Sequence, residues 1–119
     1  MIRSFLVSLF DSAYKLNKEN ILSLCQNNPR AKLLDLGCDD GRWTELVARK
    51  IGTTEVHGVE IVPERAAAAR KRGINVVEHD LNTPLPYADA SFDVIHANQV
   101  IEHVSSVDLF TSEIYRCLK

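Results

Sequence analysis

The sequence lacks three features that would each define a class of protein: long apolar runs, basic blocks and paired cysteines. No segment approaches the roughly 20 apolar residues that cross a bilayer, so no membrane span is predicted. The 14 basic and 16 acidic residues give a net charge of -2, and this balance does not favour nucleic acid as a partner. The three cysteines form no C-x-x-C pair, which indicates reduced thiols in a cytoplasmic protein rather than a disulfide framework or a zinc site.

The glycine pattern of dinucleotide-binding proteins is also missing from the stretch LLDLGCDDG, residues 33–41. That pattern needs glycine at its first, third and sixth positions, whereas here the third position is Asp39 and the sixth is Arg42. A nucleotide- or NAD-binding Rossmann protein is therefore a disfavoured alternative.

The same stretch is typical of a strand, a tight turn and a helix. Residues 31–36 are mostly apolar, the turn lies between Gly37 and Gly41, and helical spacing continues as far as Gly52. Such a unit directs the free N–H groups of a helix at a point beyond the strand, where a ligand can bind. An ordinary strand-to-helix turn has the same local pattern, so the stretch alone leaves both interpretations open.

The rest of the chain repeats the alternation of strand and helix. We expect further strands at 55–59, 74–77 and 92–97, and helices at 42–51, 63–72 and 105–119. Because each crossover must return over a face of the sheet, the pattern predicts an α/β, Rossmann-like fold with a doubly wound parallel sheet in the order 3-2-1-4. The ligand crevice of such a sheet lies at the carboxyl ends of its first and fourth strands.

The first 30 residues are expected to form a separate helical segment, 1–30, that precedes the domain at 31–119. Asp11 interrupts the apolar run after about seven residues, so a signal peptide is not predicted. Apolar residues at helical spacing instead predict an amphipathic helix that packs on the domain or lies over its ligand. The core role is the favoured one, and a second helix is expected at 18–26. The residues that carry this spacing are Phe5, Leu6, Leu9, Phe10, Ala13 and Tyr14.

Three sequence segments then stand in a distinctive order: DLGCDDG, VEIVPE and EHDLNTPLPYADASFDVIHANQVIEHV. Together they resemble the cofactor-binding half of a class I S-adenosylmethionine-dependent methyltransferase, most closely the ubiquinone and menaquinone biosynthesis branch. The resemblance runs from about residue 33 to the last residue. It implies methyl transfer from S-adenosylmethionine to an acceptor, expected to be a small molecule, that the sequence does not identify. A non-catalytic module of the same fold remains an alternative.

An acid at the end of the second strand can accept hydrogen bonds from both ribose hydroxyls of this cofactor, and Glu60 lies about twenty residues beyond the glycine turn, as that task requires. By the resemblance, Asp80 accepts a hydrogen bond from the adenine amine, with Leu81 making backbone contacts and Ile61 packing on the ring. The resemblance also implies a methionine end held by Asp35 and the carbonyl of Gly37, beside Asn98 and Gln99. The full set of predicted cofactor-binding residues is Asp35, Gly37, Cys38, Asp39, Gly41, Glu60, Ile61, Asp80, Leu81, Asn98 and Gln99.

Asp39 is a departure from the family pattern, which usually has glycine at this position. Its carboxylate could face the cationic part of the ligand or oppose the ligand's carboxylate, and aspartate tolerates unusual backbone angles only partly. Cys38 is expected to pack rather than react, since no histidine is adjacent in sequence to activate it.

The four histidines lack metal-ligand spacing, so no metal site is predicted and structural roles are expected for His57, His79 and His96. His103 lies in the segment IEHV, which borders the acceptor site in the resembling family. It is the candidate catalytic residue, to orient or deprotonate an acceptor.

The fourth strand, FDVIHA, is apolar on both faces, as in a central parallel strand. The resembling family continues with a fifth strand beyond this point, so we expect the domain at 31–119 to be incomplete. We therefore expect either a longer protein or self-association through the exposed edge of strand four.

Overall fold

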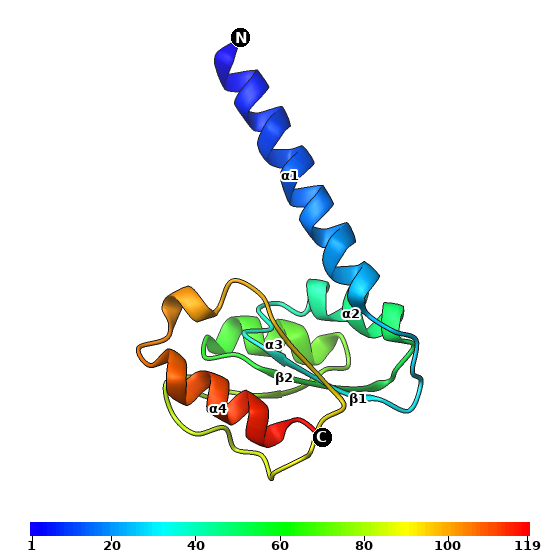
Figure 1. Cartoon of the computed structure of the whole chain (residues 1–119), viewed down its shortest axis with the longest axis vertical. Helices are drawn as coiled ribbons and strands as arrows, with labels where there is room; N and C mark the ends of the chain where they lie inside the picture. The colour runs from blue at the N-terminus through cyan, green and yellow to red at the C-terminus, as the bar shows by residue number, and fades with distance from the viewer.

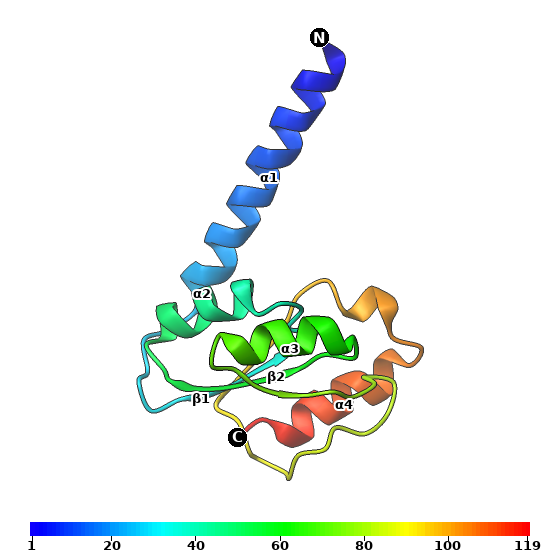
Figure 2. The same cartoon turned by 180° about the vertical axis from the view of Figure 1, so that it is seen from behind.

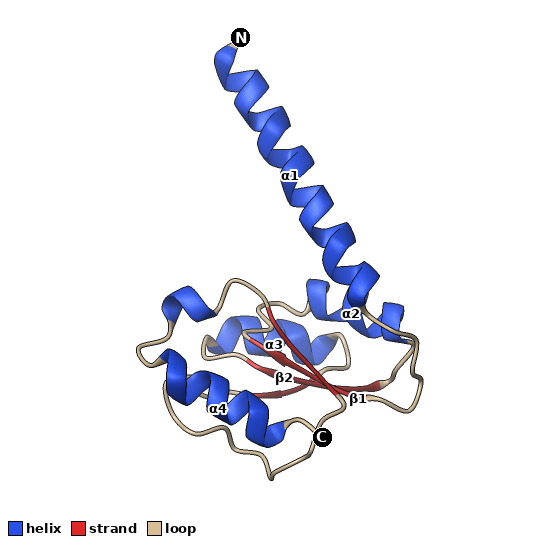
Figure 3. Ribbon diagram, viewed as in Figure 1, coloured by secondary structure: helices blue, strands red, loops and turns tan.

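A four-stranded parallel sheet forms the centre of the fold (Figure 3). The computed structural model describes residues 1–119, and its strands are β1 (Lys32–Leu36), β2 (Glu55–Val59), β3 (Asn75–Val77) and β4 (Val94–Ala97). The strands lie in the order β3-β2-β1-β4, which confirms the predicted order. The carboxyl ends of β1 and β4 are therefore adjacent, and the chain leaves both strands at the same edge of the sheet.

Helices cover both faces of the sheet (Figures 1 and 2). On one face, α2 (Arg42–Ile51) packs on Leu33, and α3 (Pro63–Lys71) packs through its alanines on Val76. On the other face, α4 (Val107–Cys117) packs through Phe110 on Leu34 and Leu36. Because successive side chains of a strand point to opposite faces, a mostly apolar β1 is buried on both sides.

The fourth strand is shorter than its apolar run, and this corrects two predicted boundaries. Phe92 lies outside β4 and forms an isolated parallel bridge with Leu118. The last helix consequently ends at Cys117, whose carbonyl accepts the N–H of Phe92 at 3.0 Å. Backbone hydrogen bonds near the end of the chain thus join it to residues 90–92, which precede β4, and helical periodicity alone does not indicate this pairing. Pairing of the remaining β4 edge with another chain stays a prediction.

The N-terminal segment is a single helix, α1 (Ile2–Leu24), and the expectation that it packs into the core is wrong. None of its residues is buried, and Phe5 and Phe10 are 65% and 72% exposed. The helix extends away from the sheet, with the N-terminus at its far end (Figure 1). Only its C-terminal half approaches the domain, where Leu22 packs beside α2. Helical spacing predicts an apolar face but not the surface, if any, that covers it.

No helix of the structure combines the length and the apolar character needed to cross a membrane. The exposed α1 interrupts its apolar residues with charges such as Asp11, Lys15 and Lys18.

Candidate functional site

The turn after β1 depends on two glycines. Gly37 and Gly41 have φ angles of +74° and +80°, in the left-handed region that side chains disfavour. A Cβ at Gly41 would also lie 2.6 Å from Cδ1 of Ile74 and 3.1 Å from the backbone of Ala69. The N–H of Gly37 donates to the carbonyl of Val59 at 2.8 Å. The turn therefore packs closely against α3 and is hydrogen-bonded to the last residue of β2.

Glu60 follows β2 directly and is buried at this edge of the sheet. One carboxylate oxygen accepts the N–H of Asp39 at 3.0 Å, and the other accepts the N–H of Val62 at 2.9 Å. A carboxylate has about four acceptor positions, so each oxygen retains one for a ligand. The residue thus connects the glycine turn to β2 and still offers a paired acceptor.

A network of hydrogen bonds lies next to the turn, and the sequence analysis did not predict it. Asp35 of β1 is buried, with Oδ1 2.7 Å from Nδ1 of His96 and Oδ2 accepting the hydroxyl of Thr44 at 2.5 Å. Nε2 of His96 in turn accepts the indole N–H of Trp43 at 3.1 Å. The sheet register pairs Asp35 with His96 directly across β1 and β4. A histidine inside an apolar strand is the one sequence feature that could have indicated this network. The sequence could not identify Asp35 as its partner, because that contact depends on the register between β1 and β4.

The network defines the tautomer of His96. Because the indole N–H of Trp43 can only donate, Nε2 must accept, and the ring proton lies on Nδ1, which donates to Asp35. Asp35 therefore has one hydrogen bond on each oxygen before any ligand arrives. It can contribute to a methionine subsite only through its remaining acceptor positions.

Two cavities lie at the carboxyl edge of the sheet and meet at Glu60. The larger, about 470 Å³, contains these predicted residues in its wall: Asp35, Gly37, Cys38, Asp39, Glu60, Ile61, Asn98, Gln99 and His103. The smaller, about 190 Å³, contains Gly37, Glu60, Ile61, Asp80, Leu81 and His103. Of the predicted set, only Gly41 lines neither cavity, because it lies under the turn against α3. The structure thus gathers residues that lie at or beyond the carboxyl ends of all four strands around one elongated site.

Asp80 is exposed at the end of the smaller cavity. Its Oδ1 accepts both the backbone N–H and the side-chain amide of Asn82, each at 2.9 Å. These hydrogen bonds lower the pKa of Asp80 below its ordinary value. The turn therefore holds an ionised carboxylate whose Oδ2 remains free to accept a hydrogen bond.

Asp39 has a φ of +50°, a left-handed backbone conformation that glycine adopts more readily than aspartate. This conformation explains why glycine is the usual residue at this position. The carboxylate of Asp39 lies 3.3 Å from the guanidinium of Arg65, and both side chains are more than half exposed. The charge of Asp39 is thus directed toward α3 at the mouth of the larger cavity.

Cys38 is buried under the turn, and burial raises the pKa of its thiol to about 12, with the charges of Asp35 and Glu60 acting in the same direction. A neutral, buried thiol does not serve as a nucleophile, which agrees with a packing role.

His103 belongs to the short 3₁₀ helix η1 (Ile101–His103), and its side chain lines both cavities. The chain between β4 and η1 passes through Gln99, which has a φ of +55°. Strained residues of this kind cluster at functional sites. No three His, Cys, Asp or Glu side chains come close enough together to hold a metal ion.

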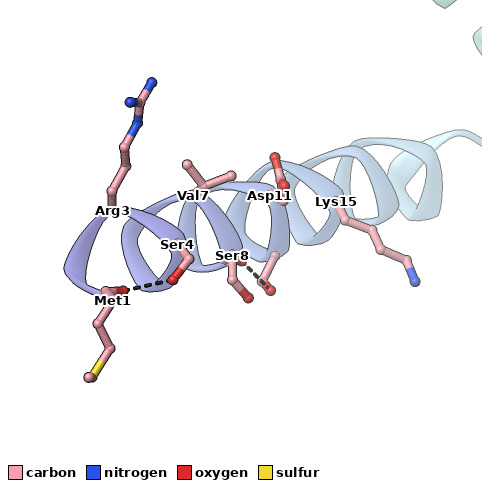
Figure 4. Close-up of a pocket in the computed structure, with 8 residues that line it drawn as sticks. Met1, Arg3, Ser4, Val7, Ser8, Asp11 and Lys15 are labelled. Atoms are coloured by element: carbon pink, nitrogen blue, oxygen red, sulfur yellow. Dashed lines mark hydrogen bonds between the residues drawn. The ribbon is translucent and has the colours of Figure 1, made fainter.

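A wider hollow, about 750 Å³, runs along α1 (Figure 4). Its lining residues are Met1 and residues of α1. Two of its hydroxyls bond back along the helix: Ser4 donates to the carbonyl of Met1 and Ser12 to that of Ser8, each at 2.8 Å. It is the side of an uncovered helix rather than an enclosed site. The candidate site is therefore the pair of cavities at Glu60.

The fold and the site together define a class I S-adenosylmethionine-dependent methyltransferase fold. In sequence, residues 34–119 match the family described as "Methyltransferase domain". The chain belongs to this family.

Named relatives and solved structures agree with this assignment. The chain is 31% identical over 114 residues to the bifunctional methionine biosynthesis protein MetXA/MetW of Rhodopirellula baltica, covering 89% of the chain and 18% of that protein. It is 35% identical over 103 residues to the ubiquinone biosynthesis O-methyltransferase of Agrobacterium fabrum, covering 75% and 41%. A Haloferax volcanii methyltransferase, solved in complex with the Trm112 methyltransferase activator, has the same fold with a TM-score of 0.77 at 21% identity, covering 85% of the chain and 46% of that structure. The chain thus spans less than half the length of each of these proteins.

Proposed function

We propose that this chain forms the cofactor-binding part of an S-adenosylmethionine-dependent methyltransferase that acts on a small-molecule acceptor. The observation that carries the proposal is the position of Glu60, a buried carboxylate at the meeting point of two cavities with an acceptor position left on each oxygen. A vicinal diol such as that of ribose presents two hydroxyl donors to this arrangement. Family membership supports the same ligand.

The free Oδ2 of Asp80 suits the exocyclic amine of adenine in the smaller cavity. Ile61 is 60% exposed at the wall that both cavities share, where an apolar ring would cover it. The larger cavity, with Asp35, Asn98 and Gln99, would then hold the methionine end. Adenine, ribose and methionine subsites follow one another in the order of the ligand's own parts.

S-adenosylmethionine would supply a methyl group already activated as a sulfonium. The task left to the protein is to align an acceptor with that methyl and to exclude water, so neither a nucleophile nor a catalytic triad is needed. His103 lines both cavities and is the residue proposed to orient or deprotonate the acceptor. The name of the ubiquinone biosynthesis relative supports an acceptor that is a small molecule. With all three cysteines free, a reducing compartment such as the cytoplasm is the proposed location.

Isothermal titration calorimetry with S-adenosylmethionine, S-adenosylhomocysteine and NAD tests the proposal. Loss of the hydrogen-bonded charge in Glu60→Ala should weaken S-adenosylhomocysteine binding by about 1.5 to 3 kcal/mol, roughly ten- to a hundredfold. Glu64→Ala is the matched control, because Glu64 is an exposed acid in the first turn of α3. Binding of NAD in preference to both sulfur ligands would support the Rossmann alternative. Unchanged affinity in a folded Glu60→Ala variant would contradict the site assignment.

A further inference from the structure

The turn after β3 is joined to the start of α4 by one side chain, that of Asn82. Its Nδ2 donates to Oδ1 of Asp80 at 2.9 Å, and its Oδ1 accepts the N–H of Ser105 at 2.6 Å. Asp80 is the proposed adenine acceptor, whereas Ser105 lies 23 residues beyond Asn82, next to the N-cap of α4, Ser106. A single amide therefore connects the cofactor turn with the segment that leads into α4.

The chemistry of the two partners fixes the orientation of this amide. The N–H of Ser105 can only donate, so it faces Oδ1, and the ionised carboxylate of Asp80 can only accept, so it faces Nδ2. The backbone N–H of Asn82 donates to the same Oδ1 of Asp80 at 2.9 Å. Among side chains of this length, aspartate lacks the donor and leucine lacks both groups. Asparagine is thus the residue that can make both contacts.

The segment on the other side of the amide contains η1 and His103. None of the three residues of η1 is buried, and the N–H of His103 donates to the carbonyl of Val100 at 2.9 Å within this short turn. Its position is therefore set by its flanks: Val100 packs in the core before it, and Val104 packs against the same cluster after it. The hydrogen bond from Ser105 to Asn82 adds a polar contact to the second flank.

Asp80, Asn82 and His103 also line one cavity, the smaller of the two that meet at Glu60. A ligand on the free Oδ2 of Asp80 leaves the bond between Oδ1 and Asn82 in place. Binding would therefore restrain the turn, and the amide would pass that restraint to Ser105 and η1.

We propose that Asn82 is a positioning residue, which fixes η1 and His103 relative to the turn that receives the cofactor. This inference rests on the proposed function. His103 can orient an acceptor only if its ring is held at a defined place beside the bound cofactor. Because η1 buries none of its residues, the amide contributes that restraint, through Asp80 on one side and Ser105 on the other.

Nuclear magnetic resonance on the whole chain tests the inference, first without ligand. Asn82→Ala removes both hydrogen bonds of the side chain, so exchange of the Ser105 amide should quicken about fivefold. The ring resonances of His103, assigned with a His103→Gln variant, should shift in Asn82→Ala. Those of His57 and His96, which lie in β2 and β4, should stay in place.

Asn82→Asp separates the two links. It keeps an acceptor for the N–H of Ser105, but it sets a second carboxylate against Asp80. At saturating S-adenosylhomocysteine we expect exchange of the Ser105 amide to slow about fivefold in the unaltered chain, and by less than about twofold in Asn82→Asp. Thr83→Val is the matched control, because the hydroxyl of Thr83 bonds within the turn, to the carbonyl of Asp80 at 2.8 Å. It should keep the effect of the ligand on Ser105.

Three results would overturn the inference while leaving the proposed function intact. Unchanged exchange of Ser105 in Asn82→Ala would show that the bond is absent in solution. Unchanged His103 resonances in that variant would limit Asn82 to anchoring α4, and an equal ligand effect in Asn82→Asp would show that the coupling takes another route. Failure of the unaltered chain to bind S-adenosylhomocysteine in calorimetry would instead overturn the proposed function, and the inference with it.

Discussion

The network of Asp35, His96 and Trp43 makes a quantitative prediction about stability. In His96→Leu the carboxylate of Asp35, 3% exposed, loses the hydrogen bond at 2.7 Å and keeps only that from Thr44. A hydrogen bond to a charged group contributes about 1.5 to 3 kcal/mol, and the indole N–H of Trp43 loses its acceptor for about 1 kcal/mol more. We therefore expect His96→Leu to lower the free energy of unfolding by about 2.5 to 4 kcal/mol.

Urea unfolding followed by far-ultraviolet circular dichroism measures this change, because the midpoint shifts at constant slope. Trp43→Phe keeps the ring and removes only the N–H, so it should cost about 1 kcal/mol. Both changes break the same bond between Trp43 and His96, and the double variant should therefore be less destabilised than the sum of the single variants. A His96→Leu protein within about 0.5 kcal/mol of the unaltered chain would show that the network is not formed in solution.

The remaining predictions concern backbone positions with positive φ. Gly41→Ala should lower the free energy of unfolding by about 2 kcal/mol or more, because the added methyl meets Ile74 at 2.6 Å and the φ of +80° is strained for alanine. Gly73→Ala is the control. Its φ is +83°, but a Cβ there has nothing within 4 Å, so it should cost only about 1 kcal/mol. Equal losses in thermal unfolding would refute the close approach at Gly41. Asp39→Gly should bind S-adenosylhomocysteine within about threefold of the unaltered chain, since the lost exposed ion pair is worth about 0 to 1 kcal/mol; a larger loss would show that the carboxylate faces the ligand.

The sequence by itself determined the order of the elements, and through it the topology of the sheet. Apolar runs bounded by turn residues are local signals, and right-handed crossovers leave few ways to connect them, so the order β3-β2-β1-β4 could be derived without coordinates. The same reasoning placed Glu60 at the carboxyl edge of the sheet, because it directly follows a strand. The positive φ angles of Gly37 and Gly41 were equally local consequences of a tight turn.

Only the tertiary structure decided which polar groups meet across the site. Asp35 and His96 are 61 residues apart, and their contact depends on the register between β1 and β4, which no local pattern specifies. Helical spacing likewise described an apolar face on α1 but could not tell whether the core covers it, and the structure leaves it exposed. Lys18 reaches the cavity because α1 ends beside α2, so that the aromatic ring of Trp43 holds its ammonium. Local patterns depend on neighbours along the chain, whereas these contacts depend on the packing of distant elements.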